Sequence, residues 1–205
     1  MEYILDKNRT LWYIYDKRKF PKERLQMEFK ELIEARRSIR QYAENVVVTE
    51  DDIKAMISAA QQAPSWKNSQ TGRYYAVISP EMLEKVRSEC LPEFNRNNSE
   101  HAAALIVTAY VSNRSGFERD GNPTNELGNE WGAYDLGLQN ENLVLAARDN
   151  GFDTLIMGIR NADKLHEMLN IPEDQHVMSV IAVGKRAAEP QKPARKNPED
   201  IVAMF

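Results

Sequence analysis

Cysteine and histidine are scarce in this sequence of 205 residues, which holds one Cys and three His. A single cysteine, Cys90, excludes an intrachain disulfide and any cysteine-based metal site, and nothing points to an oxidising compartment. The histidines His101, His166 and His176 lie in different segments, without the His-x-x-x-His spacing of a metal site. The sequence therefore predicts no bound metal and an incidental thiol.

Long apolar runs and an excess of positive charge are also missing. No stretch reaches membrane-spanning length, and early charges interrupt the apolar run that a signal peptide would need. The formal net charge of −4 argues against a general polyanion binder. We therefore expect a cytoplasmic protein that binds neither membrane nor nucleic acid.

A dinucleotide-binding fingerprint is absent as well. Gly128, Gly132 and Gly137 do not form a Gly-x-Gly-x-x-Gly turn after a strand. What the chain does have is a globular balance of 42% hydrophobic and 28% charged residues, at a length that suggests one compact domain.

The chain divides into an N-terminal arm, residues 1–24, and a body, residues 25–205. The arm mixes aromatic and basic residues without clear periodicity. Packing against the body or a partner subunit is the favoured interpretation. The alternative is a nucleic-acid-binding arm, which would show salt-sensitive binding that is lost when the arm is removed.

Hydrophobic periodicity predicts the elements of the body. A helix begins at Leu25, and a second begins after Thr49, whose hydroxyl can cap it, and stops before Pro64. Further helices are predicted over 80–87, 130–150 and 162–169, with Gly151 ending the longest of them. Strands are predicted over 74–79, 104–111, 154–159 and 177–183, polar loops over 95–99 and 112–125, and a Pro- and Lys-rich tail over 186–205.

The order of these elements favours an α/β/α sandwich over a doubly wound sheet. The predicted strands are short, one long helix lies in the middle of the chain, and both ends are loosely patterned.

A basic segment, Arg36-Arg37-Ser38-Ile39-Arg40, follows the first predicted helix. Residues two apart on an extended segment project to the same side, so Arg36, Ser38 and Arg40 would converge while Ile39 points to the core. Two guanidinium groups and a hydroxyl suit a phosphate or the polar carbonyl edge of a flavin. The alternative is that the basic residues offset the dipole at the C-terminus of a helix.

A second polar segment, residues 63–70, connects a helix to a strand with the sequence Ala-Pro-Ser-Trp-Lys-Asn-Ser-Gln. Its hydroxyl and amide groups are spaced to surround a planar polar ligand. An ordinary polar connection is the alternative.

Together these segments resemble the nitroreductase family, whose chains carry an Arg-Arg-Ser-x-Arg stretch followed by a Pro-Ser-x-x-Asn-x-Gln loop. The resemblance extends over roughly residues 28–202, because further motifs follow in the family's order. These are Asp135-x-Gly137, Asn142-Leu143-x-Leu145-Ala146-Ala147, Gly151-x-x-Thr154 with Gly158, Leu169-x-Ile171-Pro172-Glu173, Ala182-Val183-Gly184 and Arg195-Lys196.

The resemblance implies an α+β fold: an α/β/α sandwich with a central, mostly antiparallel sheet, a long central helix, and an extended C-terminal tail exchanged in a homodimer. It implies two flavin mononucleotide (FMN) sites at the subunit interface. By position, Arg36, Arg37, Ser38 and Arg40 would hold the flavin from one chain, and Pro64, Ser65, Trp66 and Asn68 would come from the other. Arg195 and Lys196 would help at the phosphate, and the backbone at Met157 and Gly158 would approach the flavin ring.

The activity implied is electron transfer from NADH or NADPH through flavin N5 to a nitroaromatic, quinone or related small-molecule acceptor. The nicotinamide would bind transiently over the flavin in a ping-pong cycle that needs no catalytic acid or base from the protein. A flavin-binding storage or sensing dimer without reductase turnover is the alternative.

The loop departs from the family pattern at Trp66, Lys67, Thr71 and Gly72, where small residues and Pro-Trp are common. Trp66 either closes over the flavin, sandwiches an aromatic acceptor, or serves as a surface or core tryptophan. The sequence therefore leaves the range of acceptors open.

Overall fold

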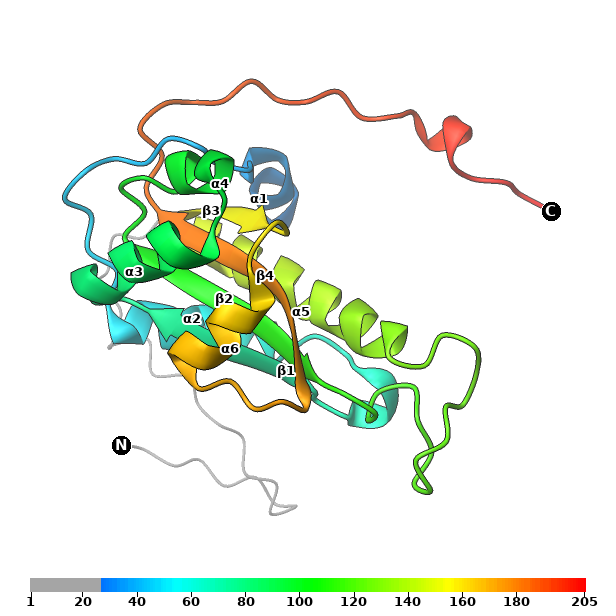
Figure 1. Ribbon diagram of the computed structural model, residues 1–205. Helices are drawn as coiled ribbons and strands as arrows, with labels where there is room; N and C mark the ends of the chain where they lie inside the picture. Colours follow the sequence, from blue (N-terminus) through cyan, green and yellow to red (C-terminus); the bar gives the residue numbers. More distant parts are fainter. Residues whose placement is uncertain (1–26) are drawn as a thin grey trace, which may run out of the picture.

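A computed structural model describes residues 27–205 (Figure 1). The predicted arm, residues 1–24, lies outside the described residues, as does the predicted start of the first helix at Leu25.

The body is built on one antiparallel sheet of four strands. They are β1 (Gly72–Val77), β2 (Ala104–Val111), β3 (Asp153–Met157) and β4 (Gln175–Gly184), in the order β1-β2-β4-β3. All neighbouring pairs run antiparallel. Helices cover both faces of this sheet (Figure 1), so the expected α+β sandwich with an antiparallel sheet is confirmed.

Alternation along the strands divides the apolar core into two layers. Leu105 and Val107 of β2 pack in one layer with α3 (Pro80–Cys90) and α6 (Ala162–Leu169). Ile106, between them, faces the other layer, with α2 (Glu50–Ala60) and α5 (Glu130–Asp149). Successive side chains of a strand point to opposite faces, which lets the central strands be apolar on both sides.

The helix boundaries agree with several sequence signals. Thr49 caps α2 and forms a reciprocal capping box with Asp52. Helix α5 runs for 20 residues and is followed by Gly151 at φ +79°, the left-handed conformation expected at that position. The long helix lies along the sheet and spans the molecule.

Three elements differ from the predictions. The first helix, α1, covers Phe29–Ala35, and a helix α4 covers Glu93–Asn98 where a polar loop was predicted over 95–99. Asparagine is a weak helix former, but tertiary contacts override that preference here. The buried Asn95 amide donates to the Ile159 carbonyl at 2.7 Å, and the Ser99 hydroxyl donates to the Asn95 carbonyl at 2.8 Å. Strand β1 also begins two residues earlier than predicted.

The C-terminal tail leaves the body after β4 and runs outward as an exposed segment with one short helical turn, η3 (Pro198–Asp200) (Figure 1). Exposed apolar side chains gather near its end, among them Ile201, Met204 and Phe205. Within residues 27–205, no helix has the length and apolar character needed to cross a membrane.

Gly132 of α5 lies against a neighbouring ring, and we expect Gly132→Ala to lower the free energy of unfolding by about 1–3 kcal/mol. A Cβ at this position would come within 2.4 Å of the Tyr110 ring, closer than packing allows. Gly137 on the same helix has no neighbouring atom within 4 Å of a Cβ, so Gly137→Ala should instead add up to about 1 kcal/mol. Urea unfolding of both variants measures these two free energies. Equal losses of stability in Gly132→Ala and Gly137→Ala would contradict the prediction.

Candidate functional site

The basic segment that follows α1 lies against the edge strand β3. Ser38 forms a parallel bridge with Thr154, and the Ile39 amide donates to the Thr154 carbonyl at 2.9 Å. Ile39 is 1% exposed and belongs to the core, whereas Ser38 and Arg40 are exposed. The prediction that Ile39 points inward from this segment is therefore confirmed, and it leaves Ser38 and Arg40 on the outer side.

Arg37 serves a local role in the structure. Its guanidinium donates to the Glu34 carbonyl at 2.6 Å and to the Arg36 carbonyl at 2.7 Å, at the end of α1. Basic side chains at this end of a helix satisfy carbonyls that lack helical partners. The helix-end interpretation thus describes Arg37, while Arg36, Ser38 and Arg40 remain as the group that can face a ligand.

A buried ion pair lies next to the start of the basic segment. Asp153 is 3% exposed and accepts hydrogen bonds from the Arg186 side chain at 2.6 and 3.0 Å, with Arg148 at 3.3 Å. These hydrogen bonds raise the pKa of the Arg186 guanidinium above its ordinary value. Arg186 also donates to the Ala35 carbonyl at 3.3 Å, so it ties the end of β4 to the last residue of α1.

The end of β3 lies on the same sheet edge as the basic segment. Met157 is buried, and Gly158 after it is exposed, with no described atom within 4 Å of the position that a Cβ would occupy. Ile156 is exposed although it lies within the strand. Sequence reasoning did not single out Ile156, because its apolar character predicts burial in a strand.

The segment 64–70 forms a tight loop around the short helix η2 (Trp66–Asn68). Ser65 Oγ accepts from the Gln70 amide at 3.1 Å. Lys67, Asn68 and Gln70 all have positive φ, between 46° and 55°. Residues other than glycine rarely adopt this backbone conformation, and such strain is concentrated at ligand-binding sites. The strained backbone is consistent with a ligand-binding loop.

A buried carboxylate fixes this loop to α5. Asp135 accepts a hydrogen bond from the Trp66 amide at 2.9 Å and another from the Ser115 hydroxyl. The Trp66 ring lies 4.7 Å from that of Trp131, which in turn contacts the Tyr134 ring at 5.6 Å. The motif around Asp135 was recognised in the sequence, but its role in holding the loop depends on a tertiary contact.

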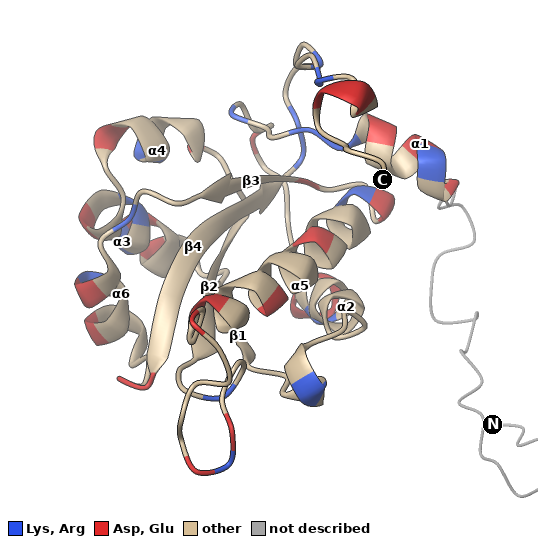
Figure 2. Cartoon of the chain, turned by 90° about the vertical axis from the view of Figure 1, so that its right-hand side faces the viewer, with Lys and Arg blue, Asp and Glu red and all other residues tan. Residues whose placement is uncertain are grey.

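The basic segment and the loop lie toward opposite ends of α5 (Figures 1 and 2). Helix α1 contacts the C-terminal part of α5, where the Met27 amide donates to Asp149. The loop is held at Asp135, fourteen residues earlier and therefore about 21 Å away along the helix axis at 1.5 Å per residue. One chain thus does not bring the two predicted halves of the site together.

Arg195 and Lys196 lie on the exposed tail, beyond the body. Arg195 donates to the Pro193 carbonyl at 3.4 Å, a contact within the tail itself. The structure therefore places these two residues on a segment that extends away from the sheet (Figure 1).

The donor set of the basic segment fits the phosphate or the polar edge of FMN. Among residues 27–205, no carboxylate forms an ion pair with Arg36 or Arg40, and a hydroxyl lies between them in sequence. A guanidinium without a carboxylate partner is available to an anionic ligand. Over the same described range, no cluster of three or more His, Cys, Asp or Glu side chains could hold a metal ion.

Comparison with known proteins gives a consistent result. The model of the nitroreductase family matches residues 33–185. An Archaeoglobus fulgidus protein named as an NADH dehydrogenase/NAD(P)H nitroreductase is 32% identical over 157 residues, or 75% of this chain and 82% of that protein. A Lactiplantibacillus plantarum protein named as a CLA biosynthesis enone reductase is 27% identical over 183 residues, or 76% of this chain and 84% of that protein.

Solved structures show the same fold. A protein from Exiguobacterium sibiricum, described as a nitroreductase in complex with FMN, superposes with a TM-score of 0.77 at 23% identity. The match covers 87% of this chain and 98% of that one.

Proposed function

Because the chain belongs to the nitroreductase family, we propose that it is an FMN-dependent NAD(P)H oxidoreductase that reduces a nitroaromatic, quinone or related small-molecule acceptor. Its relatives are named as NAD(P)H nitroreductases, and the Exiguobacterium protein of the same fold was solved with FMN. The observation that carries the proposal is the pair of Arg36 and Arg40, which forms no ion pair with a carboxylate of residues 27–205 and lies on the segment that bridges to Thr154 of β3.

When bound, FMN supplies a ring that takes hydride from NADH or NADPH at N5 and then passes electrons to the acceptor in a ping-pong cycle. The protein's share is binding and electrostatics. Arg36 and Arg40 provide positive charge that stabilises an anionic ligand, and Ser38 contributes a hydrogen-bonding hydroxyl. The exposed Ile156 offers an apolar surface on β3, the strand that this segment bridges.

We propose that each site is completed by a second copy of the chain. The contacts of Met27 and of Trp66 with α5 are about 21 Å apart along the helix axis, and the basic segment and the loop lie toward opposite ends of that helix. Pro64, Ser65, Trp66 and Asn68 would therefore reach the flavin of the partner. The exposed apolar end of the tail supports an exchanged tail, because contiguous exposed apolar side chains mark interaction surfaces. Such an exchange would carry Arg195 and Lys196 toward the other subunit.

Stopped-flow spectroscopy tests the reductase against the alternative of a flavin-binding storage or sensing dimer. FMN-loaded protein is mixed without oxygen with NADH or with NADPH, and the flavin absorbance is followed. Rapid bleaching supports the reductase. A flavin that is bleached by dithionite but by neither NADH nor NADPH supports the storage or sensing dimer. Protein that takes up no FMN contradicts both hypotheses.

Replacing Trp66 by alanine is expected to change acceptor preference more than FMN retention. Trp66 lies in the loop beside Trp131, and stacking of its ring on an aromatic acceptor would contribute about 0.5–1.5 kcal/mol to the binding of that acceptor. The ratio of kcat/KM for a nitroaromatic to that for a quinone should therefore shift by about 2- to 10-fold. Phe94→Ala, which removes an exposed ring on α4, is the control. An unchanged acceptor profile would remove Trp66 from the acceptor site.

A further inference from the structure

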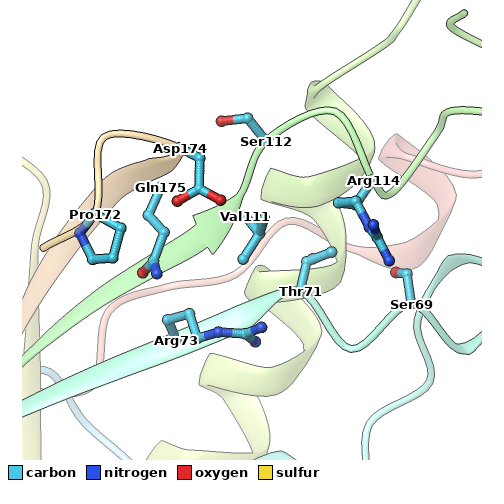
Figure 3. A pocket seen from close by; sticks show the side chains of 9 residues that line it. All are labelled: Ser69, Thr71, Arg73, Val111, Ser112, Arg114, Pro172, Asp174 and Gln175. Atoms are coloured by element: carbon cyan, nitrogen blue, oxygen red, sulfur yellow. The ribbon is translucent and has the colours of Figure 1, made fainter. Parts of the chain in front are cut away.

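A cavity of ≈ 560 Å³ lies at the end of the sheet, where β1 begins and β2 ends. Its walls include Ser69, Thr71, Arg73, Arg114, Asp174 and Gln175 (Figure 3). A Cβ on Gly72 would meet Gln139 of α5, so Thr71 and Arg73, on either side of it, face away from that helix. The cavity therefore opens on the opposite side of the sheet from α5.

Two guanidinium groups give the cavity an excess of positive charge over the single carboxylate of Asp174. Arg73 donates through Nη1 to the Gln70 carbonyl at 3.0 Å and to the Gly72 carbonyl at 2.8 Å, which fixes its side chain at the wall. Arg114 forms no ion pair with any carboxylate of the described chain. Its guanidinium points toward Ser69 (Figure 3).

Two hydroxyl groups in the same wall lack hydrogen-bond partners. Thr71 is 2% exposed, and neither its Oγ1 nor the Oγ of Ser69 has a partner within residues 27–205. A buried hydroxyl without a partner costs stability. Both oxygens are covered by neighbouring protein atoms, so a ligand oxygen that displaced this cover would supply the missing acceptor and would also meet the two guanidinium groups. Hydroxyl and guanidinium donors together are the set that binds a phosphate.

The other side of the cavity presents acceptor and amide groups. The Tyr75 hydroxyl donates to Gln175 Oε1 at 2.7 Å, which orients the amide and leaves its NH₂ group toward other partners. The Asp174 carbonyl accepts from the Ser112 amide at 2.8 Å, which holds the turn that carries its carboxylate. That carboxylate points into the cavity (Figure 3) and can accept hydrogen bonds from ligand hydroxyl groups.

We propose that this cavity binds a small phosphorylated sugar. The phosphate lies against Arg73, Arg114 and the hydroxyls of Ser69 and Thr71, and the sugar hydroxyls donate to Asp174. The volume is within the range of small-molecule sites, ~300–1,000 Å³. The site differs from the proposed flavin site, since it uses neither the basic segment 36–40 nor the face of the sheet that packs on α5. Of the loop 64–70 it uses Ser69, which is not among the proposed flavin-binding residues.

Calorimetric titration of the full-length protein saturated with FMN tests the proposal, because FMN then fills its own phosphate site. The probes are ribose 5-phosphate, ribose and inorganic phosphate. We expect one saturable site per chain for ribose 5-phosphate, affinity for phosphate at least about tenfold weaker, and no binding of ribose. Absence of saturable heat with ribose 5-phosphate, or equal affinity for phosphate alone, overturns the proposal.

Four variants assign the binding to this cavity. Arg73→Gln combined with Arg114→Gln should weaken ribose 5-phosphate binding at least about tenfold. Arg114→Gln alone should weaken it with FMN affinity unchanged, because only Arg73 also donates to the Gln70 carbonyl in the loop 64–70. Asp174→Asn should weaken ribose 5-phosphate without affecting phosphate. Arg119→Gln, an exposed arginine in the same loop as Arg114, is the matched control and should change neither. Binding that survives the arginine pair, or that is seen only before FMN is added, overturns the assignment.

Discussion

Asp153→Ala is expected to lower the free energy of unfolding by about 3–5 kcal/mol, the usual cost of removing one partner from a buried ion pair. Asp153 is buried and accepts from the backbone amide and the guanidinium of Arg186, with Arg148 beside it. Alanine leaves these cations without their shared acceptor. Urea unfolding at one fixed protein concentration, with equal FMN occupancy, measures the loss.

Glu189→Ala is the matched control for this prediction. Glu189 pairs with the same Arg186, but its side chain is 70% exposed, so its removal should cost less than about 1 kcal/mol. A similar loss of stability in Asp153→Ala and Glu189→Ala would show that burial does not determine how strongly an ion pair with Arg186 stabilises the fold. Since Arg186 also binds the carbonyl of Ala35, Asp153→Ala should in addition weaken FMN binding through the adjacent basic segment.

The combined variant Arg36→Ala and Arg40→Ala is expected to produce the largest loss of FMN affinity. Hydrogen bonds to charged groups contribute about 1.5–3 kcal/mol each, which corresponds to about 10- to 150-fold in the dissociation constant for each residue. The two losses need not add, because both side chains would act on one ligand. Titration of FMN fluorescence against the apoprotein measures the effect.

Lys30→Ala controls for long-range electrostatics in this experiment. Lys30 is exposed on α1, near the basic segment in sequence, and its removal changes the net charge by one unit without removing a proposed contact. We expect its effect on FMN affinity to be small and to disappear at high salt. An unchanged affinity in the double arginine variant would contradict the placement of Arg36 and Arg40 at the flavin.

Local signals in the sequence predict much of the fold. The capping residue Thr49, the terminating Gly151 and the inward-facing Ile39 each depend on neighbours within a few residues, and each is confirmed. Helix α4 was missed because its stability comes from Asn95, whose amide binds a carbonyl 64 residues away. A contact of that separation leaves no trace in local propensity.

In the candidate site, too, long-range contacts could not be predicted from the sequence. The order of motifs identifies the basic segment and the loop 64–70, but it does not reveal that Arg37 turns back onto α1. The order of motifs also does not show how far apart the two segments lie. Their separation depends on the hydrogen bond between Trp66 and Asp135, which are 69 residues apart in the sequence.

The spacing of these segments along α5 has a consequence for mixtures of variants. If each site takes its basic segment from one chain and its loop from the other, a chain altered at Arg36 and Arg40 and a chain altered in the loop are each inactive alone. Their heterodimer contains one site with both defects and one site with none. Coexpression of two inactive proteins should therefore restore turnover, a complementation that no pair of defects within a one-chain site could produce.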